Sequence, residues 1–489
     1  MARLGAARPA CLCGGKGRRN GAISIIGDIA GGIARTAEDA AARVGLGDNA
    51  VRLGVTGLAR AGKTVFITSL VANLLDRGRM PQLTAAAEGR IEAAYLMPQP
   101  DDAVQRFDFE GSLEALTGPD PHWPEPTSSV AALRLALRVR PTGLLGAARG
   151  PRTVNLDIVD YPGEWLLDLG LLERSFAEWS GTVLGRLGQR PEMAPFRAAL
   201  AATDPAAAFE EPAGKRLADA YTESLRALRV AGMSDCTPGR FLMPGELRGS
   251  PALTFAPLPP MEAPRGSLAR EFARRFEAYK SRVVQPFFRE HFARIDRQVV
   301  LVDALEAIHH GPEAVADLRR AMTDLLRAFR PGSNAVLSRL LRGRRVERIL
   351  FAATKADHLH HSQHGRLTEI MDHLLDEARR RADFAGARTE ALAIAALRAT
   401  VEQEVEHGGE TLDVVRGRLL DADGSAGRTA AFHPGELPAD PAAVLRGGEW
   451  LDDWGLMRFA PAPLTLRPGD GPPHIRLDRA AEFLFGDRL

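Results

Sequence analysis

Residues 54–75, GVTGLARAGKTVFITSLVANLL, decide the fold of this chain. The residues just before Gly57 read as a short apolar strand, and those after Thr64 place Phe66, Leu70 and Leu74 at helical spacing. A glycine-rich turn between a strand and a helix that fits G-x-x-x-x-G-K-[ST] is typical of a phosphate-binding loop. The residues predicted to contact a bound nucleotide here are Gly57, Ala59, Arg60, Ala61, Gly62, Lys63, Thr64 and Val65.

This loop has a physical reason to bind phosphate. Its glycines let successive backbone N–H groups point into one concavity, at the positive end of the following helix. Lys63 adds a full positive charge, and Thr64 offers a hydroxyl to Mg2+. An ordinary glycine-rich connection is the alternative, and the complete match between a strand and a helix makes it the minor one.

Length and composition exclude several classes of protein. A chain of 489 residues predicts two or three structural units. The net charge is +1, so no global field favours nucleic acid, and we expect no nucleic-acid partner. Cys11, Cys13 and Cys236 are too few and too scattered for a disulfide framework, which fits a reducing compartment. No run approaches 18 apolar residues, so we expect no direct membrane span and a cytoplasmic protein.

A metal-binding acid is expected at the end of a strand downstream of the loop. Residues 132–140 and 153–165 both alternate apolar and polar side chains, which predicts an antiparallel hairpin. The second run delivers Asp160 and, three residues later, Gly163, the D-x-x-G arrangement of small GTPases. We expect Asp160 to hold Mg2+ through water, and the N–H of Gly163 to bond the γ-phosphate and report its loss.

The choice of base rests on a motif after a later strand. Residues 297–311 and 345–359 predict two more apolar strands, and the second ends in Thr354-Lys355-Ala356-Asp357. In an [NT]-K-x-D motif the carboxylate accepts two hydrogen bonds from guanine, and adenine offers no such donor pair. A plain polar turn is the alternative. Residues 391–400 predict a last strand whose exit brings Ala399 near the base.

The order of these motifs resembles a Ras-like GTPase core, and their amino-acid sequences resemble those of the YcjX family of bacterial stress-associated P-loop NTPases. The resemblance covers residues 22–489 and is carried by GLARAGKTVFITSL, VDYPGEWLLDL, FFREHFARIDRQVVLVDAL, ATKADHL, ALRAT and EFLFGDRL. It implies binding and hydrolysis of GTP to GDP, a cytoplasmic location and a link to envelope stress. It also implies, often, a partner membrane protein.

The expected fold class is α/β: a Ras-like P-loop NTPase core with an inserted helical domain and a small strand-rich C-terminal unit. The insertion follows the D-x-x-G turn directly, so movement of that turn would swing its first helix, and it is the predicted surface for a membrane-protein partner. A rigid cover is the alternative. The expected divisions are an N-terminal tail and amphipathic helix 1–50, core 51–165, helical insertion 166–294, core 295–405, and C-terminal extension with terminal helix 406–489.

Three further features bear on attachment and metal binding. The apolar helical face that begins at Ile23 could lie on the inner membrane as a peripheral attachment, but its mixed charges favour packing against the protein. Residues 82–129 are Pro-rich and stand where a Ras-like fold has its first switch, which makes Thr127 a predicted third Mg2+ ligand. Four histidines follow the base motif, and we interpret them as solvated side chains on an exposed loop rather than metal ligands: His358, His360, His361 and His364.

The expected function is Mg2+-dependent GTP hydrolysis by a stress-response switch or regulator. Lys63, Gly163, Glu164 and Arg60 are the predicted catalytic residues. Glu164 stands where many relatives carry a water-orienting glutamine; its carboxylate can orient the water, although its charge is unfavourable beside phosphate. Arg60 could act as an arginine finger in cis, or face solvent, or pair with a carboxylate of the insertion. An ATPase of the same fold and a nucleotide-bound, non-catalytic scaffold are the alternatives.

Overall fold

A computed structural model describes most of the chain, and from residue 48 onward the chain forms one compact unit. The N-terminal helix expected from Ile23, the loop residue Ala59 and the switch residue Thr127 lie outside the described residues. Of residues 326–329 and 377–384 only the backbone is described. The described ranges are 50–57, 60–125, 129–143, 150–290, 294–329, 346–384 and 387–489.

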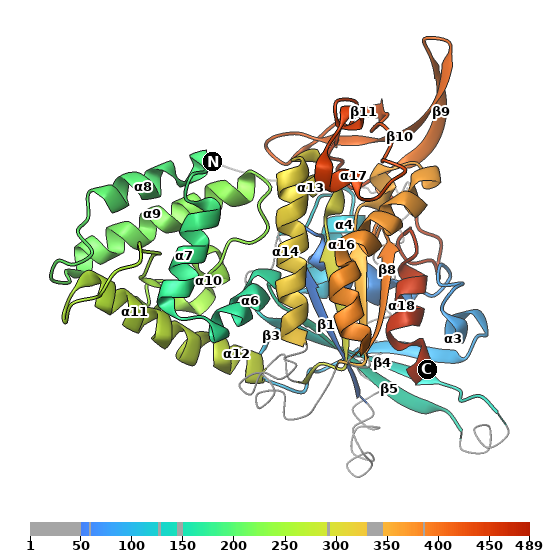
Figure 1. Cartoon of the computed structure of the whole chain (residues 1–489). Helices are drawn as coiled ribbons and strands as arrows, with labels where there is room; N and C mark the ends of the chain where they lie inside the picture. The colour runs from blue at the N-terminus through green and yellow to red at the C-terminus, as the bar shows by residue number, and fades with distance from the viewer. Residues whose placement is uncertain are drawn as a thin grey trace, which may run out of the picture. The chain divides into compact units, whose positions relative to one another are not determined.

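An eight-stranded, mostly parallel sheet forms the centre of the described chain (Figure 1). Its order is β2-β4-β5-β1-β6-β7-β8, with β3 beside β4, and the pairs that join β5, β1, β6, β7 and β8 are all parallel. The predicted hairpin is confirmed, because β4 and β5 pair antiparallel. The strands are β1 (Ala50–Gly57), β2 (Ile91–Met97), β3 (Gln105–Arg106), β4 (Ala131–Val139), β5 (Arg152–Asp160), β6 (Arg297–Val302), β7 (Arg348–Ala353) and β8 (Arg388–Ala393).

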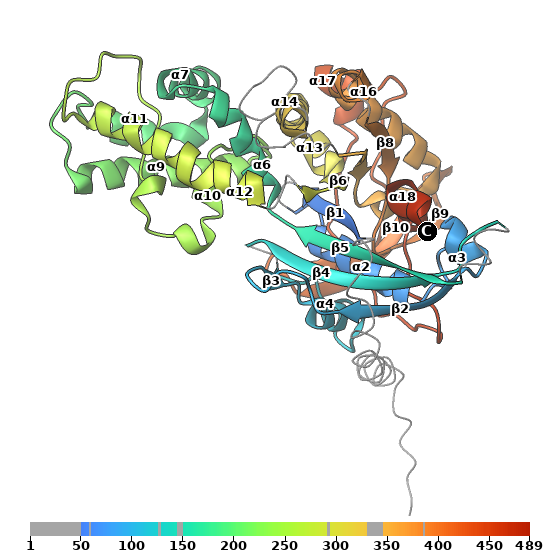
Figure 2. The same cartoon turned by 90° about the horizontal axis from the view of Figure 1, so that it is seen from below.

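Helices cover both faces of this sheet (Figure 2). Successive side chains of a strand point to opposite faces, so Leu301 of β6 packs in the cluster formed with α2 and α18, whereas Val300 packs with α14 and α16. Parallel strands that are buried on both faces need this double cover. The helices are α2 (Lys63–Leu75), α4 (Phe109–Thr117) and α18 (Leu477–Phe485) on one face, and α13 (Ala304–His309), α14 (Pro312–Phe329) and α16 (His364–Phe384) on the other.

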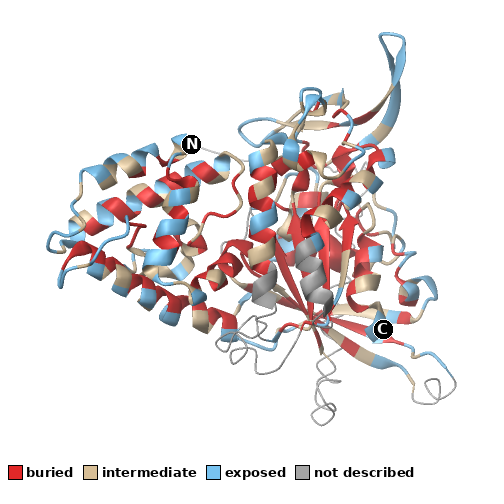
Figure 3. Ribbon diagram, in the orientation of Figure 1, coloured by how far each residue is buried: buried red, intermediate tan, exposed pale blue. Residues whose placement is uncertain are grey.

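The insertion between β5 and β6 is helical, as expected. Its centre is aromatic: Trp179 stacks on Phe276 at 5.2 Å between ring centroids and meets Tyr221 and Phe255 edge-on. The same buried cluster includes residues of α14 and α16, so the insertion shares a core with the sheet. Figure 3 shows buried residues on the helices of the insertion and in the sheet. Its helices are α6 (Gly163–Leu167), α7 (Phe176–Leu187), α8 (Ala194–Ala201), α9 (Glu211–Val230), α10 (Gly239–Leu242), α11 (Leu268–Tyr279) and α12 (Gln285–Glu290).

The strand-rich C-terminal unit is a second, three-stranded antiparallel sheet of order β11-β10-β9. Its strands are β9 (Val401–His407), β10 (Glu410–Leu420) and β11 (Ala426–Phe432), and the short helix α17 (Ala443–Arg446) follows. The last strand of the main sheet, β8, ends at Ala393, earlier than the strand predicted over 391–400, because the chain turns there to pair Ala395 with Ile475.

Four elements in the Pro-rich stretch 82–129 were not predicted: α3 (Thr84–Ala87), β2, β3 and α4. Strand β2 joins the antiparallel edge of the sheet beside β4, and α4 packs against α2 with Phe109 buried. Asp108 caps α4, because its side chain accepts a hydrogen bond from the N–H of Gly111. Prolines flank these elements and leave only short apolar runs between the turns. Such short runs do not show a clear helix or strand period, so the sequence did not predict the elements.

Candidate nucleotide site

The predicted phosphate loop leaves the end of β1 and enters α2. A Cβ atom at Gly57 would lie 2.8 Å from the carbonyl oxygen of Leu301, so only glycine fits beside β6. Gly62 has φ 81, a left-handed conformation that glycine adopts without strain, and α2 begins at the next residue. The strand–loop–helix context that the motif needs is therefore present.

Lys63 folds back over this loop. Its Nζ donates a hydrogen bond to the carbonyl oxygen of Gly57 at 3.1 Å, which holds the ammonium group across the loop. Thr64 and Val65 are half-buried in the first turn of α2, and Ala61 is buried beneath the loop. Arg60 is exposed and has φ 61, which is unusual for a residue with a side chain.

The D-x-x-G turn lies directly against the start of the phosphate loop. Asp160 ends β5 and pairs in register with Val55 of β1. A Cβ atom at Gly163 would lie 2.7 Å from the carbonyl oxygen of Gly57, so a side chain there would push the two segments apart. Packing against Gly57 is by itself a sufficient reason for a glycine at this position. A hydrogen bond from the Gly163 N–H to phosphate would be a second reason.

The oxygen donors at this edge fit a magnesium ion. Thr64 supplies a hydroxyl from the helix that follows β1, and Asp160 supplies a carboxylate from the adjacent strand β5. Hydroxyl, carboxylate and water oxygens are the ligands that Mg2+ prefers. Two other acids near these strands have partners of their own: Asp157 accepts from Arg134 Nη2 at 2.8 Å, and Asp303 forms an ion pair with Lys355.

The predicted base-recognition residues come together after β7 and β8. Oδ2 of Asp357 accepts a hydrogen bond from the N–H of Ala399 at 2.8 Å, although 42 positions separate the two. The hydroxyl of Thr400 also donates to the carbonyl oxygen of Asp357. Thr354 is held by a bond from its N–H to Val302 at 2.9 Å, and Lys355 takes a left-handed conformation with φ 61. The two loops therefore form one surface at the carboxyl end of the sheet.

Glu164 turns toward the insertion. Its side chain is buried, and Oε1 lies 3.0 Å from Nη2 of Arg229, at the C-terminal end of α9. The next residue, Trp165, has the guanidinium of Arg240 3.1 Å above its ring and donates from Nε1 to Met243 at 3.2 Å. Nothing in the local sequence around Arg229 indicates this pairing, so the sequence analysis missed it.

Asp168 connects the same segment to buried residues of the insertion by hydrogen bonds. Oδ2 of Asp168 accepts from the Tyr279 hydroxyl at 2.5 Å, and Oδ1 accepts from the N–H of Gly239 at 2.8 Å. Burial raises the pKa of Asp168 to about 7, although both hydrogen bonds and the charge of Arg240 oppose that rise. The segment after the D-x-x-G turn is therefore held by residues of α9, α10 and α11.

The interpretation of the four histidines as solvated side chains is wrong for three of them. His358, His360 and His364 are buried, and His361 alone is exposed. His364 Nε2 is 2.7 Å from the carbonyl oxygen of Ala356, and the ring of His358 meets Phe459 edge-on at 5.2 Å. Burial lowers the pKa of His358 and of His364. The turns after Asp357 fold beneath the C-terminal sheet, which a sequence pattern does not reveal.

Within the residues that the structure describes, no helix combines the length and the apolar character that crossing a bilayer requires.

Comparison with known proteins identifies the family of this chain. A model of the YcjX-like family, DUF463, matches residues 51–489. The Ras-like GTPase YcjX of Escherichia coli K12 is 38% identical over 457 residues, which cover 90% of this chain and 96% of that protein. The Ras-like GTPase YcjX of Shewanella oneidensis is 36% identical over 470 residues, which cover 90% of this chain and 95% of that protein. The chain belongs to the YcjX-like family, and its core is a Ras-like P-loop fold.

Proposed function

We propose that this protein binds guanine nucleotides and hydrolyses GTP to GDP and phosphate in a Mg2+-dependent reaction. The observation that carries the proposal is the packing of Gly163 on Gly57, which puts the D-x-x-G turn against the phosphate loop. In that arrangement the turn can respond to the γ-phosphate. The names of the two relatives, both Ras-like GTPases, support the same activity.

Each predicted residue has a role in this proposal. Lys63, Gly62 and the loop amides from Gly57 to Val65 bind the phosphates, and Mg2+, when bound, offsets the charge between them. Its proposed ligands are Thr64, Asp160 through water, and Thr127. Asp357 selects guanine, with the stem of Lys355 over the purine plane and Thr354 and Ala399 as flanking contacts.

Two charged residues have proposed catalytic roles, and that of Glu164 depends on a rearrangement. Glu164 would orient the attacking water, and to do so it must leave Arg229, to which it is now paired at 3.0 Å. Arg60 is exposed beside the loop, where a guanidinium can reach charge that develops on the transferred phosphoryl group. The contacts of Glu164, Trp165 and Asp168 with the insertion couple such a rearrangement to α9, α10 and α11.

The deciding experiment combines binding and turnover on the purified protein. Titration with labelled GDP, GTP, ADP and ATP is expected to give tight binding of the guanine nucleotides only, and phosphate release is expected to continue over many turnovers with Mg2+ and stop with EDTA. Equal affinity for ADP and GDP would make the protein an ATPase with a plain turn at Thr354–Asp357. Tight GDP binding without turnover would make it a nucleotide-bound scaffold.

The cellular role is proposed from what the family resemblance implies. We infer a cytoplasmic stress-response switch whose helical insertion, residues 166–294, carries the surface for a partner, with a membrane protein as the class to test. The observation behind this choice is that residues after Gly163 contact the insertion directly. A crosslinker placed at an exposed position of the insertion, such as Val230, is expected to capture a partner protein. The captured products are expected to differ between GTP-loaded and GDP-loaded protein.

A further inference from the structure

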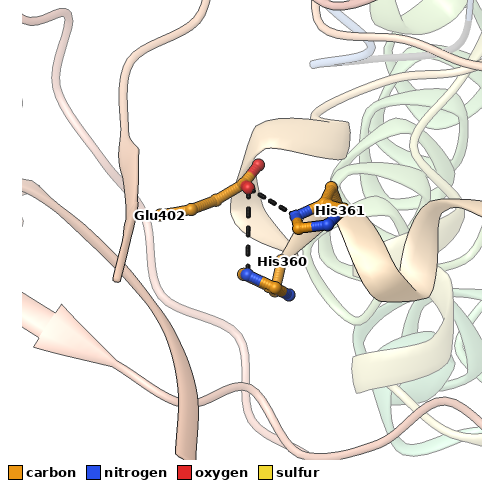
Figure 4. A group of neighbouring side chains, drawn as sticks. All are labelled: His360, His361 and Glu402. Atoms are coloured by element: carbon orange, nitrogen blue, oxygen red, sulfur yellow. Dashed lines mark hydrogen bonds and ion pairs between the residues drawn. The ribbon is translucent and has the colours of Figure 1, made fainter. Parts of the chain in front are cut away.

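A compact group of two histidines and one carboxylate lies between the loop after Asp357 and the C-terminal sheet: His360, His361 and Glu402 (Figure 4). His361 Nδ1 is 2.7 Å from Glu402 Oε2, and His360 Nε2 is 3.8 Å from the same oxygen. One atom each of His360, His361 and Glu402 lie within 4.8 Å of one another. Ligand atoms about 2.0–2.2 Å from a tetrahedral Zn2+ lie roughly 3.3–3.5 Å apart, a value between the 2.7 and 3.8 Å separations of the two histidine nitrogens from Glu402 Oε2.

The surroundings orient these side chains as the outer shell of a metal site does. Asp413 Oδ2 and the Ser362 hydroxyl both lie 2.9 Å from Nδ1 of His360. A proton on Nδ1 would serve the contact with Asp413 and leave the lone pair of Nε2 available to a metal ion. Arg398 Nη2 lies 3.1 Å from Oε1 of Glu402, so Oε2 is the oxygen turned to the histidines. A carboxylate behind a histidine ligand is the usual outer shell of a zinc site.

The fold brings these residues together from three elements. His360 and His361 follow the base-recognition turn, Glu402 lies on β9, and Asp413 lies on β10. Asp413 pairs with Glu404, two positions along β9 from Glu402, so Glu402 and Asp413 share a face of the sheet. A metal ion bound here would join the loop of Asp357 to the C-terminal sheet.

We propose that His360, His361 and Glu402 hold one divalent transition-metal ion of the Zn2+ class, with Asp413 as the outer-shell partner of His360. Two imidazole nitrogens and one carboxylate oxygen suit Zn2+, whereas Mg2+ prefers oxygen ligands throughout. The exposed ring of His361 leaves the site open to solvent, so that water completes the coordination. The site is separate from the proposed Mg2+ ligands Thr64 and Asp160, and His360 follows Asp357 by three positions in the chain.

The test is a calorimetric titration of untagged full-length protein, stripped with EDTA, exchanged into a weakly coordinating buffer and saturated with Mg2+ and GDP. ZnCl2 is expected to bind with one ion per chain. His361→Ala and Glu402→Gln each remove a ligand and are expected to abolish that saturable binding, whereas Asp413→Asn is expected to weaken it about 10- to 100-fold. Co2+ in place of Zn2+ is expected to give the visible absorption of a histidine-ligated ion in the wild type and not in His361→Ala or Glu402→Gln.

His309→Ala is the matched control, because His309 and His310 are likewise adjacent in sequence, both are exposed, and His310 lies 3.5 Å from the glutamate Glu306. This variant is expected to bind Zn2+ as the wild type does. The thermal midpoint of the wild type is expected to rise with Zn2+, and that of Glu402→Gln to stay unchanged. The proposal is overturned if the wild type binds no stoichiometric Zn2+, if His361→Ala and Glu402→Gln bind it unchanged, or if His309→Ala loses it equally.

Discussion

Nη2 of Arg229 lies 3.0 Å from Oε1 of Glu164, and this ion pair joins the residue after Gly163 to the C-terminal end of α9. The side chain of Glu164 is 5% exposed and that of Arg229 32%, so the glutamate depends on the arginine for its charge compensation. A catalytic use of Glu164 and the position of the insertion are therefore linked through one contact.

A double-mutant cycle of Glu164→Gln and Arg229→Gln measures that link. We expect a coupling free energy of about 1–3 kcal/mol in denaturant unfolding, below the value for a fully buried pair because Arg229 is partly exposed. The control is Glu223 with Arg226, an exposed pair on the same helix, for which about 0.5 kcal/mol or less is expected. A coupling free energy for Glu164 and Arg229 no larger than that of the control pair would show that this ion pair does not stabilise the contact between the D-x-x-G segment and the insertion.

The pKa of Asp168 predicts a pH dependence of stability. An acid with a higher pKa in the folded state binds its proton more tightly there, so its contribution is fully present below the unfolded value of 3.8 and is lost as the pH rises through about 7. Asp168→Asn removes this titration while keeping an acceptor for Gly239. Relative to wild type, the variant is expected to gain stability from pH 4 to pH 8, by up to roughly 4 kcal/mol.

The measurement is urea unfolding of both proteins at each pH. Asp219→Asn, on the exposed face of α9, is the control and is expected to differ from wild type by less than about 0.5 kcal/mol at every pH. A constant difference between Asp168→Asn and wild type across this range would contradict the raised pKa.

Asp357 is expected to set the choice of base. Asp357→Asn presents an N–H where guanine needs an acceptor, so GDP affinity is expected to fall by about 2–5 kcal/mol in a fluorescence titration. Xanthine carries a carbonyl in place of the amine of guanine, so XDP is expected to recover binding to the variant. Unchanged GDP affinity, or no recovery with XDP, would show that Asp357 does not contact the base.

Thr64 and Asp160 are expected to be needed for Mg2+-dependent hydrolysis. Thr64→Ala and Asp160→Asn are expected to remove turnover in a phosphate-release assay, and Lys63→Ala to weaken nucleotide binding itself. Asparagine is preferable to alanine at Asp160, because this side chain is buried and not on an open cleft. Circular dichroism is the check of folding, and hydrolysis that survives Asp160→Asn would place the metal-binding acid elsewhere.

Arg60 can be tested as an arginine finger. If it acts in cis, Arg60→Ala keeps GDP affinity and loses about ten- to a thousandfold in single-turnover hydrolysis. Arg60→Asn suits the left-handed conformation at φ 61 and is expected to recover part of the rate only when potassium replaces sodium. Wild-type rates for both variants in either salt would leave catalysis to Glu164, the metal or a partner.

The sequence by itself determined the α/β core and the order of its motifs. The Gly57–Thr64 loop and the alternating residues of β4 and β5 follow from local rules: glycine permits the turn, and period-2 burial defines the strands. The same rules placed Asp160 and Asp357 at the ends of strands, where parallel strands direct their residues to one edge of the sheet. The helical insertion was equally evident, because its apolar residues recur with the period of a helix.

Only the tertiary structure decided which side chains these residues meet. Arg229 reaches Glu164, and Tyr279 reaches Asp168 across 111 positions, because the insertion and the sheet share one buried core. Three of the histidines after Asp357 were misjudged for the same reason, since distant residues pack on them: Phe459 on His358, Asp413 of β10 on His360 and Arg476 on His364. Strand β9 brings Glu402 to His361. Local patterns set the backbone and the face of each side chain, whereas partners distant in sequence are chosen by the packing of whole elements, which no short stretch of sequence encodes.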